Sequence, residues 1–159
     1  MLKAGDRAPD FRLPDQDGRE VSLAELLAQG PLVLYFYPAD FTPGCTREAC
    51  GIRDLHGELL RAGLRVVGVS PQDSASHARF RERHRLPFPL LADVEKRVIR
   101  AFGVDGPLGW GVRRATFLVG AGGVIRDAVL ADLRIDRHAR FLRSAIELGR
   151  TGPGLTGGE

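Results

Sequence analysis

The run PLVLYFYP, from Pro31 to Pro38, is an almost unbroken series of apolar and aromatic residues that ends at a proline. This pattern is typical of a strand that is buried on both faces, as in the middle of a parallel sheet. LRVVGVSP (64–71) and ATFLVG (115–120) have the same character. The turn GAGG (120–123) leads from the last of these into VIRDAVL (124–130), which predicts a hairpin. The sequence therefore predicts a sheet built around a buried central strand.

Four segments between and after these strands have the helical spacing of apolar residues. They are 42–62, a segment from Asp73 or Ser74 to about Arg85, 94–102 and 136–148. The apolar residues of the first are Ala49, Ile52, Leu55, Leu59 and Leu60. The last places on one side Ala139, Leu142, Ala145 and Ile146. Strands that alternate with helices predict an α/β fold.

The two ends of the chain differ from this central pattern. PDFRLPDQDGREVSL (9–23) predicts a small β-hairpin that turns at Asp17-Gly18. Because no repeat or linker interrupts the chain, residues 1–150 are expected to form a single domain. The Gly-rich tail 151–159 is expected to be disordered.

The composition disfavours several classes of function. Apolar residues make up 43% of the 159 residues, as in an ordinary globular domain, and no segment is long and apolar enough to cross a bilayer. The net charge is only +3, and the basic run ARFRERHRL (78–86) lacks interleaved aromatic residues, so we interpret it as the solvated face of a helix. The start, MLKAGDRAPDF, has no apolar run that could act as a secretion signal. A cytoplasmic protein without nucleic-acid or membrane partners is therefore expected.

Both cysteines of the chain fall within YPADFTPGCTREAC, from Tyr37 to Cys50. Thr42 precedes a proline and suits a helix N-cap, and Pro43 suits the first helical position. Cys45 is thus expected in the first turn of a helix that begins just beyond the carboxyl end of a central strand, where α/β sheets usually carry their sites. Helix N-termini favour the thiolate form of cysteine, so we expect Cys45 to act as a nucleophile.

The spacing of Cys45 and Cys50 disfavours a permanent cross-link. Positions i and i+5 of a helix place their Cα atoms roughly 8.6 Å apart, whereas a disulfide rarely tolerates more than about 7 Å. The pair could form a bond only after a turn unwinds. Packing in the core is disfavoured because Cys45 lies in a Thr-Pro-Gly cap and not on the apolar stripe. A zinc site would need further ligands, and a thioredoxin-type pair would need C-x-x-C.

The segment YPADFTPGCTREAC resembles the active-site segment of the peroxiredoxins, whose pattern Pro-x-x-x-Thr/Ser-x-x-Cys falls on Pro38, Thr42 and Cys45. The second cysteine five residues later resembles the subgroup called bacterioferritin comigratory protein or peroxiredoxin Q. GDRAPDFRLPDQDG (5–18), VVGVSPQDSASHARFRERHRLPFPLLAD (66–93) and RATFLV (114–119) resemble other parts of that family.

The resemblance implies a role for each matching residue. Cys45 would be the peroxidatic cysteine, which attacks the peroxide and becomes a sulfenic acid. Thr42 would bond the peroxide and Pro38 would shield the pocket. Arg114 would stabilise the thiolate and the leaving oxygen.

The same resemblance extends to supporting residues and to the reductant. Glu48 would orient the arginine, and backbone N–H groups near Gly44 would complete an anion-binding cradle. Cys50 would be the resolving cysteine, which forms an intramolecular disulfide that thioredoxin or a similar dithiol then reduces. Trp110 could line the pocket or pack against its neighbours, and packing is the preferred alternative. No catalytic role is expected for the histidines, which are His56, His77, His84 and His138.

The implied fold is thioredoxin-like, with a central mixed β-sheet flanked by helices and an N-terminal β-hairpin extension. The implied activity is reduction of hydrogen peroxide and small organic hydroperoxides by a monomer or weak homodimer that needs no metal or organic cofactor. Two alternatives remain open at this point. One is a redox sensor that uses the same disulfide switch, and the other is a disulfide reductase, which the missing C-x-x-C disfavours.

Overall fold

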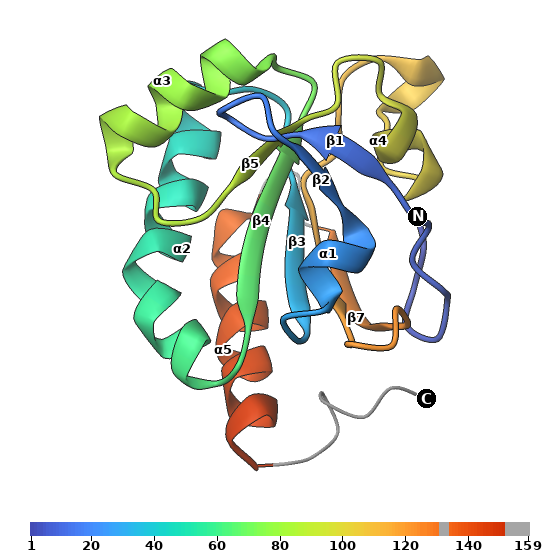
Figure 1. Ribbon diagram of the computed structural model, residues 1–159, viewed down its shortest axis with the longest axis vertical. Helices are drawn as coiled ribbons and strands as arrows, with labels where there is room; N and C mark the ends of the chain where they lie inside the picture. Colours follow the sequence, from blue (N-terminus) through green and yellow to red (C-terminus); the bar gives the residue numbers. More distant parts are fainter. Residues whose placement is uncertain (131–133, 152–159) are drawn as a thin grey trace.

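The buried run near the middle of the chain forms β3 (Leu32–Phe36), the central strand of a five-stranded sheet in the computed structural model (Figure 1). The structure describes residues 1–130 and 134–151. In spatial order the strands are β5 (Leu90–Ala92), β4 (Arg65–Ser70), β3, β6 (Ala115–Val119) and β7 (Ile125–Leu130). β3 is parallel to β4 and antiparallel to β6, so the sheet is mixed, as predicted. β6 and β7 form the predicted antiparallel hairpin.

The predicted helices are present, with different bounds in some cases. They are α2 (Pro43–Arg61), α3 (Ser74–His84), α4 (Arg97–Ala101) and α5 (Ile135–Thr151). α4 is shorter than expected, and α5 continues three residues beyond the predicted end at Leu148. Residues 152–159 of the predicted tail lie outside the described residues. The sequence pattern missed three short elements, α1 (Leu23–Leu27), β5 and a 3₁₀ turn at Pro107–Gly109, because each is too short to show a period.

The N-terminal hairpin forms as predicted. β1 (Arg12–Pro14) and β2 (Glu20–Ser22) pair in an antiparallel manner, with Leu13 opposite Val21. Gly18 has a φ of 79°, a left-handed conformation that favours glycine, so the turn lies where Asp17-Gly18 predicted it. Ser22 then caps α1 by accepting a hydrogen bond from the Glu25 backbone.

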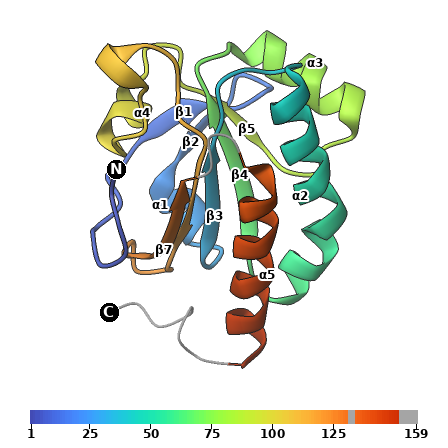
Figure 2. The ribbon, with the colours of Figure 1, turned by 180° about the vertical axis from the view of Figure 1, so that it is seen from behind.

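Alternate side chains of β3 enter two separate hydrophobic cores, because successive residues of a strand point to opposite faces. Leu32, Leu34 and Phe36 lie in a core that includes residues of the hairpin, α1 and α4. Val33 and Tyr35 lie in a core that includes residues of α2, α3 and α5. Figure 2 shows α2 and α5 side by side on this second face. The sheet therefore separates the hairpin side of the molecule from the side that carries the cysteine helix.

Two details of the predicted helix faces are wrong. Ala139 is exposed, and its neighbour His138 is buried in its place. Leu60 of α2 is 46% exposed. In both helices the remaining apolar positions pack in the second core. The predicted helical spacing is therefore correct, and the buried face of each helix is slightly rotated from the predicted face.

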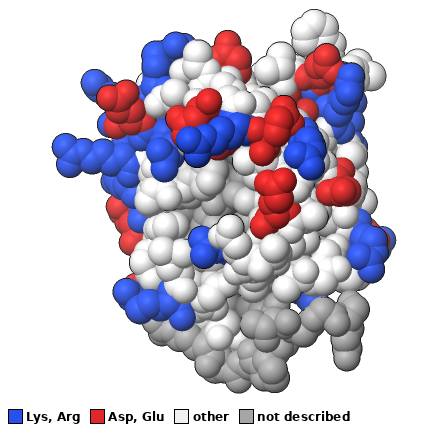
Figure 3. Space-filling model, viewed as in Figure 1, with Lys and Arg blue, Asp and Glu red and all other residues white. Residues whose placement is uncertain are grey.

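The surface carries both signs of charge. Figure 3 shows basic and acidic side chains intermixed on one face of the molecule. In α3, Arg79, Glu82 and Arg83 are exposed and Phe80 is buried, which is the solvated helix face predicted for 78–86. Within the described residues, no helix is long and apolar enough to cross a membrane.

Candidate active site

The first turn of α2 begins at the residue that the sequence predicted. Thr42 is the N-cap, with extended φ and ψ of −75° and 148°, and Pro43 occupies the first helical turn. The carbonyl of Thr42 accepts the first helical hydrogen bond, from the Thr46 backbone at 2.9 Å. The Thr42 hydroxyl does not cap the helix. It donates instead to the carbonyl of Ala39 at 3.1 Å, which closes the loop between β3 and α2.

Cys45 is buried, with only 1% of its surface exposed. It lies in the second core with Ala49 and Ile52, so the expectation that it sits off the apolar stripe of α2 is wrong. Cys50 is half-buried, and both cysteines are free thiols. Because α2 runs without a break through both positions, the two sulfurs cannot bond in this conformation.

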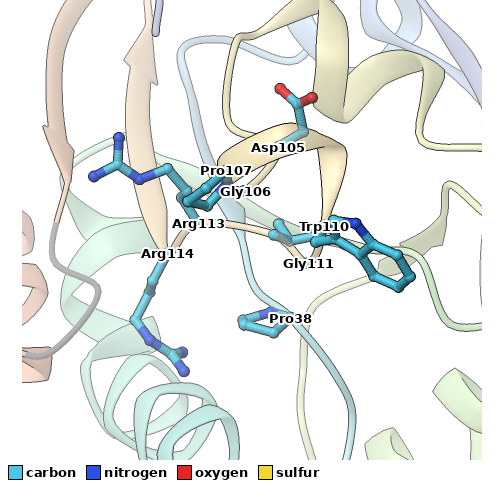
Figure 4. A pocket seen from close by; sticks show the side chains of 9 residues that line it. Pro38, Asp105, Gly106, Pro107, Trp110, Gly111, Arg113 and Arg114 are labelled. Atoms are coloured by element: carbon cyan, nitrogen blue, oxygen red, sulfur yellow. The ribbon is translucent and has the colours of Figure 1, made fainter.

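Arg114 brings a positive charge to the Cys45 sulfur. Its Nη2 donates to Cys45 Sγ at 3.2 Å, and its Nη1 donates to Glu48 Oε1 at 2.8 Å. Figure 4 shows that Arg114 and its neighbour Arg113 point in opposite directions, as adjacent residues of extended chain do. Burial acts to lower the pKa of Arg114, but the negative charges of Glu48 and Cys45 outweigh it and raise that pKa. The guanidinium is therefore a permanent cation that sulfur and carboxyl share.

The Glu48 carboxyl is buried between a cation and a histidine. Its Oε2 lies 3.3 Å from His138 Nδ1, and that nitrogen lies 2.5 Å from Thr116 Oγ1. Burial raises the pKa of Glu48 to about 7, although the charge and hydrogen bonds of Arg114 act to lower it. Near neutral pH this carboxyl therefore changes charge beside the cation that contacts Cys45.

A cavity of about 600 Å³ opens next to this cluster. Pro38, Trp110 and Arg114 are among its lining residues (Figure 4). Trp110 is 81% exposed and lines the cavity, which is the less favoured of the two alternatives that the sequence left open. Gly44 is half-buried in the first turn of α2, where the backbone N–H groups have no helical partners. The cavity thus places an apolar rim beside a cation and a helix N-terminus.

The structure brings together most of the residues that the sequence singled out. Cys45, Glu48 and Arg114 are in contact, and Pro38 lies with Arg114 on the cavity wall. Cys50 lies apart from this cluster, in the next turn of α2. Within the described part of the chain, no group of histidine, cysteine and carboxylate side chains could hold a metal ion.

Sequence reasoning missed three buried polar residues near the site. His138 lies against Glu48, and His77 pairs with Asp40 of the loop that precedes α2. The sequence carries a weak signal for His138 only, because it occupies an inward position of an amphipathic helix. Asp40 and His77 are 37 residues apart, and no local pattern connects them.

Comparison with known proteins points to one family. A model of the AhpC/TSA family matches residues 4–128. Peroxiredoxin Bcp of Escherichia coli K12 is 44% identical over 143 residues, which are 86% of this chain and 90% of the relative. The chloroplastic peroxiredoxin Q of Oryza sativa subsp. japonica is 45% identical over 138 residues, or 86% of this chain. Those residues span 63% of the rice protein's length.

Solved structures give the same result. Peroxidoxin BcpB from Mycobacterium tuberculosis superposes with a TM-score of 0.86 at 39% identity, covering 92% of this chain and 97% of that one. The bacterioferritin comigratory protein of Xanthomonas campestris, whose structures concern its alkyl peroxide reduction activity, gives a TM-score of 0.78 at 31% identity, covering 86% and 90%. These likenesses confirm the predicted thioredoxin-like fold. The chain belongs to the AhpC/TSA family, together with peroxiredoxins of the Q and Bcp type.

Proposed function

We propose that this protein is a thiol-dependent peroxidase in which Cys45 is the residue that reacts with hydroperoxides. The observation that carries the proposal is the contact of the Arg114 guanidinium with the Cys45 sulfur inside a buried turn beside an open cavity. The cation and the helix N-terminus both favour the thiolate, which is the nucleophilic form. Relatives named as peroxiredoxins support the same assignment.

The first step forms an S–O bond and breaks the O–O bond of the substrate. The Cys45 thiolate attacks one peroxide oxygen, so the sulfur is oxidised to a sulfenic acid. The other oxygen leaves with the electron pair and takes up a proton as water or an alcohol. The Arg114 guanidinium would stabilise the negative charge that develops on the leaving oxygen. Thr42 and the Gly44 backbone would position the peroxide, and Pro38 would limit access of water.

The second step uses Cys50. Its thiol attacks the Cys45 sulfenic acid, a disulfide forms and water leaves. Because α2 separates the two residues, its first turns must unwind before this attack. A dithiol such as thioredoxin would then reduce the disulfide by exchange and would itself be oxidised. The apolar rim at Trp110 suits the alkyl group of a small organic hydroperoxide, in line with the activity described for the Xanthomonas campestris relative.

Peroxide consumption by the two serine variants tests this function. Purified protein with thioredoxin, its reductase and NADPH should consume hydrogen peroxide. Cys45→Ser should abolish turnover. Cys50→Ser should react once with peroxide and then stop, because its sulfenic acid has no internal partner. Full turnover by Cys45→Ser contradicts the proposal. Oxidation of the wild type without recycling by any dithiol would favour a redox sensor.

A further inference from the structure

The loop that joins β3 to α2 carries a buried carboxyl that the proposed mechanism does not use. Asp40 lies between Pro38 and Thr42, and its side chain is 0% exposed. Three side chains lie within hydrogen-bond distance of it, each at 2.7 Å: the Tyr37 hydroxyl, the Ser76 hydroxyl and His77 Nδ1. Tyr37 follows β3, whereas Ser76 and His77 belong to the first turn of α3. The loop is therefore fastened to a helix that is distant in sequence.

The partners of His77 orient its ring toward Asp40. Its Nε2 lies 3.0 Å from the carbonyl of Leu91, which can only accept, so Nε2 carries a proton. Its Nδ1 faces the Asp40 carboxyl, which already accepts hydrogen bonds from two hydroxyl groups. Burial acts to raise the pKa of Asp40, but the hydrogen bond and charge of His77 outweigh it and hold that pKa below its usual value. Asp40 and His77 thus form a buried, hydrogen-bonded carboxyl–imidazole pair.

The backbone of the loop 38–42 is strained at Phe41 and needs contacts from outside the loop to hold it. Phe41, which follows Asp40, has a φ of 64°, a left-handed conformation that is unfavourable for a bulky residue. Its ring packs edge-on against Phe80 of α3, with the centroids 5.2 Å apart. In both ribbon views α3 lies beside the N-terminal end of α2 (Figures 1 and 2). Contacts with α3 therefore hold the strained loop that leads into the Cys45 turn.

We propose that Asp40 and His77 are a positioning pair for the peroxidatic turn, holding the loop 38–42 and the start of α2 in the conformation that reacts with peroxide. Within the described residues, the hydrogen bonds of Asp40 and His77 go to other partners than the Cys45 sulfur, so the pair acts through the loop. The inference rests on the proposed peroxidase function, because it assigns the pair to one of that function's two steps.

The two steps should respond to the pair in opposite ways. Attack on peroxide needs the folded loop, with Pro38 and Thr42 beside Cys45. Disulfide formation needs the same region to unwind. Loss of the pair should therefore slow the first step and should not slow the second. General loss of stability would not separate the steps in this manner.

Four variants test the proposal by single turnover with one equivalent of hydrogen peroxide, acid quench and intact mass. Asp40→Ala removes all three bonds and should slow Cys45 oxidation by about tenfold or more, since small displacements of reacting groups cost up to about a hundredfold. Its disulfide step should be as fast as in the wild type or faster. Asp40→Asn should restore oxidation to within about threefold. Its amide can donate to a neutral His77 and still accept from Tyr37.

Asp73→Ala is the matched control. The Asp73 side chain caps α3 by accepting from the Ser76 backbone at 2.8 Å, whereas Asp40 is bound by the side chains of Tyr37, Ser76 and His77. Its loss should destabilise α3 and leave both step rates within about threefold. If Asp40→Ala and Asp73→Ala change the two steps alike, or if Asp40→Ala slows both steps, the pair is only structural and the proposal is wrong.

Ser76→Ala decides the matter if Asp40→Ala does not fold. It removes one half-buried hydroxyl donor and should slow Cys45 oxidation by about threefold without slowing the disulfide step. An unchanged oxidation rate in this variant overturns the proposal. Failure of the peroxidase function itself would look different, because the wild type would then show no sulfenic acid or disulfide at Cys45.

Discussion

At the scale of single residues, Cys45 and Glu48 both contact the Arg114 cation. Arg114 donates to the sulfur of Cys45 and to the carboxyl of Glu48 through its two terminal nitrogens. When Glu48 is ionised, its charge engages the guanidinium and lies close to the sulfur. When Glu48 is neutral, this opposing negative charge is absent and the guanidinium acts more strongly on the sulfur. The protonation of Glu48 is thus coupled, through Arg114, to the charge beside the Cys45 sulfur.

Glu48 should make folding stability depend on pH. Below pH 4.5, the ordinary pKa of this side chain, the carboxyl is protonated in both the folded and the unfolded chain. Between 4.5 and about 7 the unfolded chain releases the proton and the folded protein keeps it, so stability falls as pH rises. Above about pH 7 the carboxyl is ionised in both the folded and the unfolded chain, and the loss of stability no longer changes with pH. In urea unfolding, the unfolding free energy of Glu48→Gln should therefore decline less between pH 4.5 and about 7 than that of the wild type.

Glutamine is the informative substitution because its carbonyl can still accept from Arg114 and it cannot ionise. The difference in unfolding free energy between variant and wild type should change between pH 4.5 and 7 in favour of the variant, and should level off above that range. A difference that is independent of pH would mean that Glu48 titrates as it does in the unfolded chain.

The residues of this cluster divide into those that local sequence predicts and those that it does not. The N-cap at Thr42 and the place of Cys45 in the first helical turn follow from chemistry within four positions, since a residue before proline suits an N-cap and proline suits the first helical position. That Cys45 faces the core was not predicted. His138 cannot be found in this way, because Glu48 meets it only when α5 packs on α2. Sequence analysis recognised Arg114 by resemblance alone, and its choice over Arg113 depends on the strand register that only the fold supplies.

At the scale of elements, the proposed mechanism requires α2 to be stable enough to hold Cys45 and weak enough to release it. Gly51 directly follows Cys50, and a Cβ added there would meet nothing within 4 Å. Alanine stabilises a helix by about 0.5–1 kcal/mol relative to glycine. Gly51→Ala should therefore slow formation of the Cys45–Cys50 disulfide by up to about fivefold and leave the first reaction with peroxide unchanged. Quenched single-turnover mass measurements report both rates.

Gly57→Ala provides the matched control in the same helix. A Cβ at Gly57 meets only Arg61 Nη1 at 3.6 Å, an ordinary contact, so its stabilising effect should be similar. Gly57 lies two turns beyond Cys50, outside the part that unwinds. If the two alanine variants slow the disulfide step equally, release of Cys45 requires melting of the whole helix.

The element scale also shows which parts of the fold were open to prediction. β3, β4 and β6 are long apolar runs, and α2 has a clear period and start signal, so sequence patterns predict them. β5 has three residues, and only its place beside β4 defines it as a strand. Trp110 lines the cavity because of the turn at 107–109, where Leu108 has a φ of 55°, and composition does not predict that conformation.

At the scale of the whole molecule, the turn that carries Cys45 is part of a hydrophobic core. Cys45 shares the second core with α5, β3 and β4, and its neighbour Glu48 ties that core to the start of β6 through Arg114. Oxidation of Cys45 to a disulfide therefore has a global cost, since Cys45 and Glu48 both lie in the segment that must unwind. The sheet face with the hairpin and α4 has no residue in this segment.

The oxidised protein should consequently be less stable than the reduced protein, although disulfides normally stabilise. Closing a loop of six residues stabilises by about 2 kcal/mol on the chain-entropy model. Unwinding takes the Glu48 carboxyl away from the buried Arg114 guanidinium and exposes the apolar surface of Cys45 and Ala49, and we expect these losses to exceed that gain. Urea unfolding with and without reductant should therefore show a lower free energy and a smaller slope for the disulfide form, which buries less surface. A Cys45→Ser/Cys50→Ser variant measured under both conditions controls for the reagents, and a more stable disulfide form would show that the core does not depend on this turn.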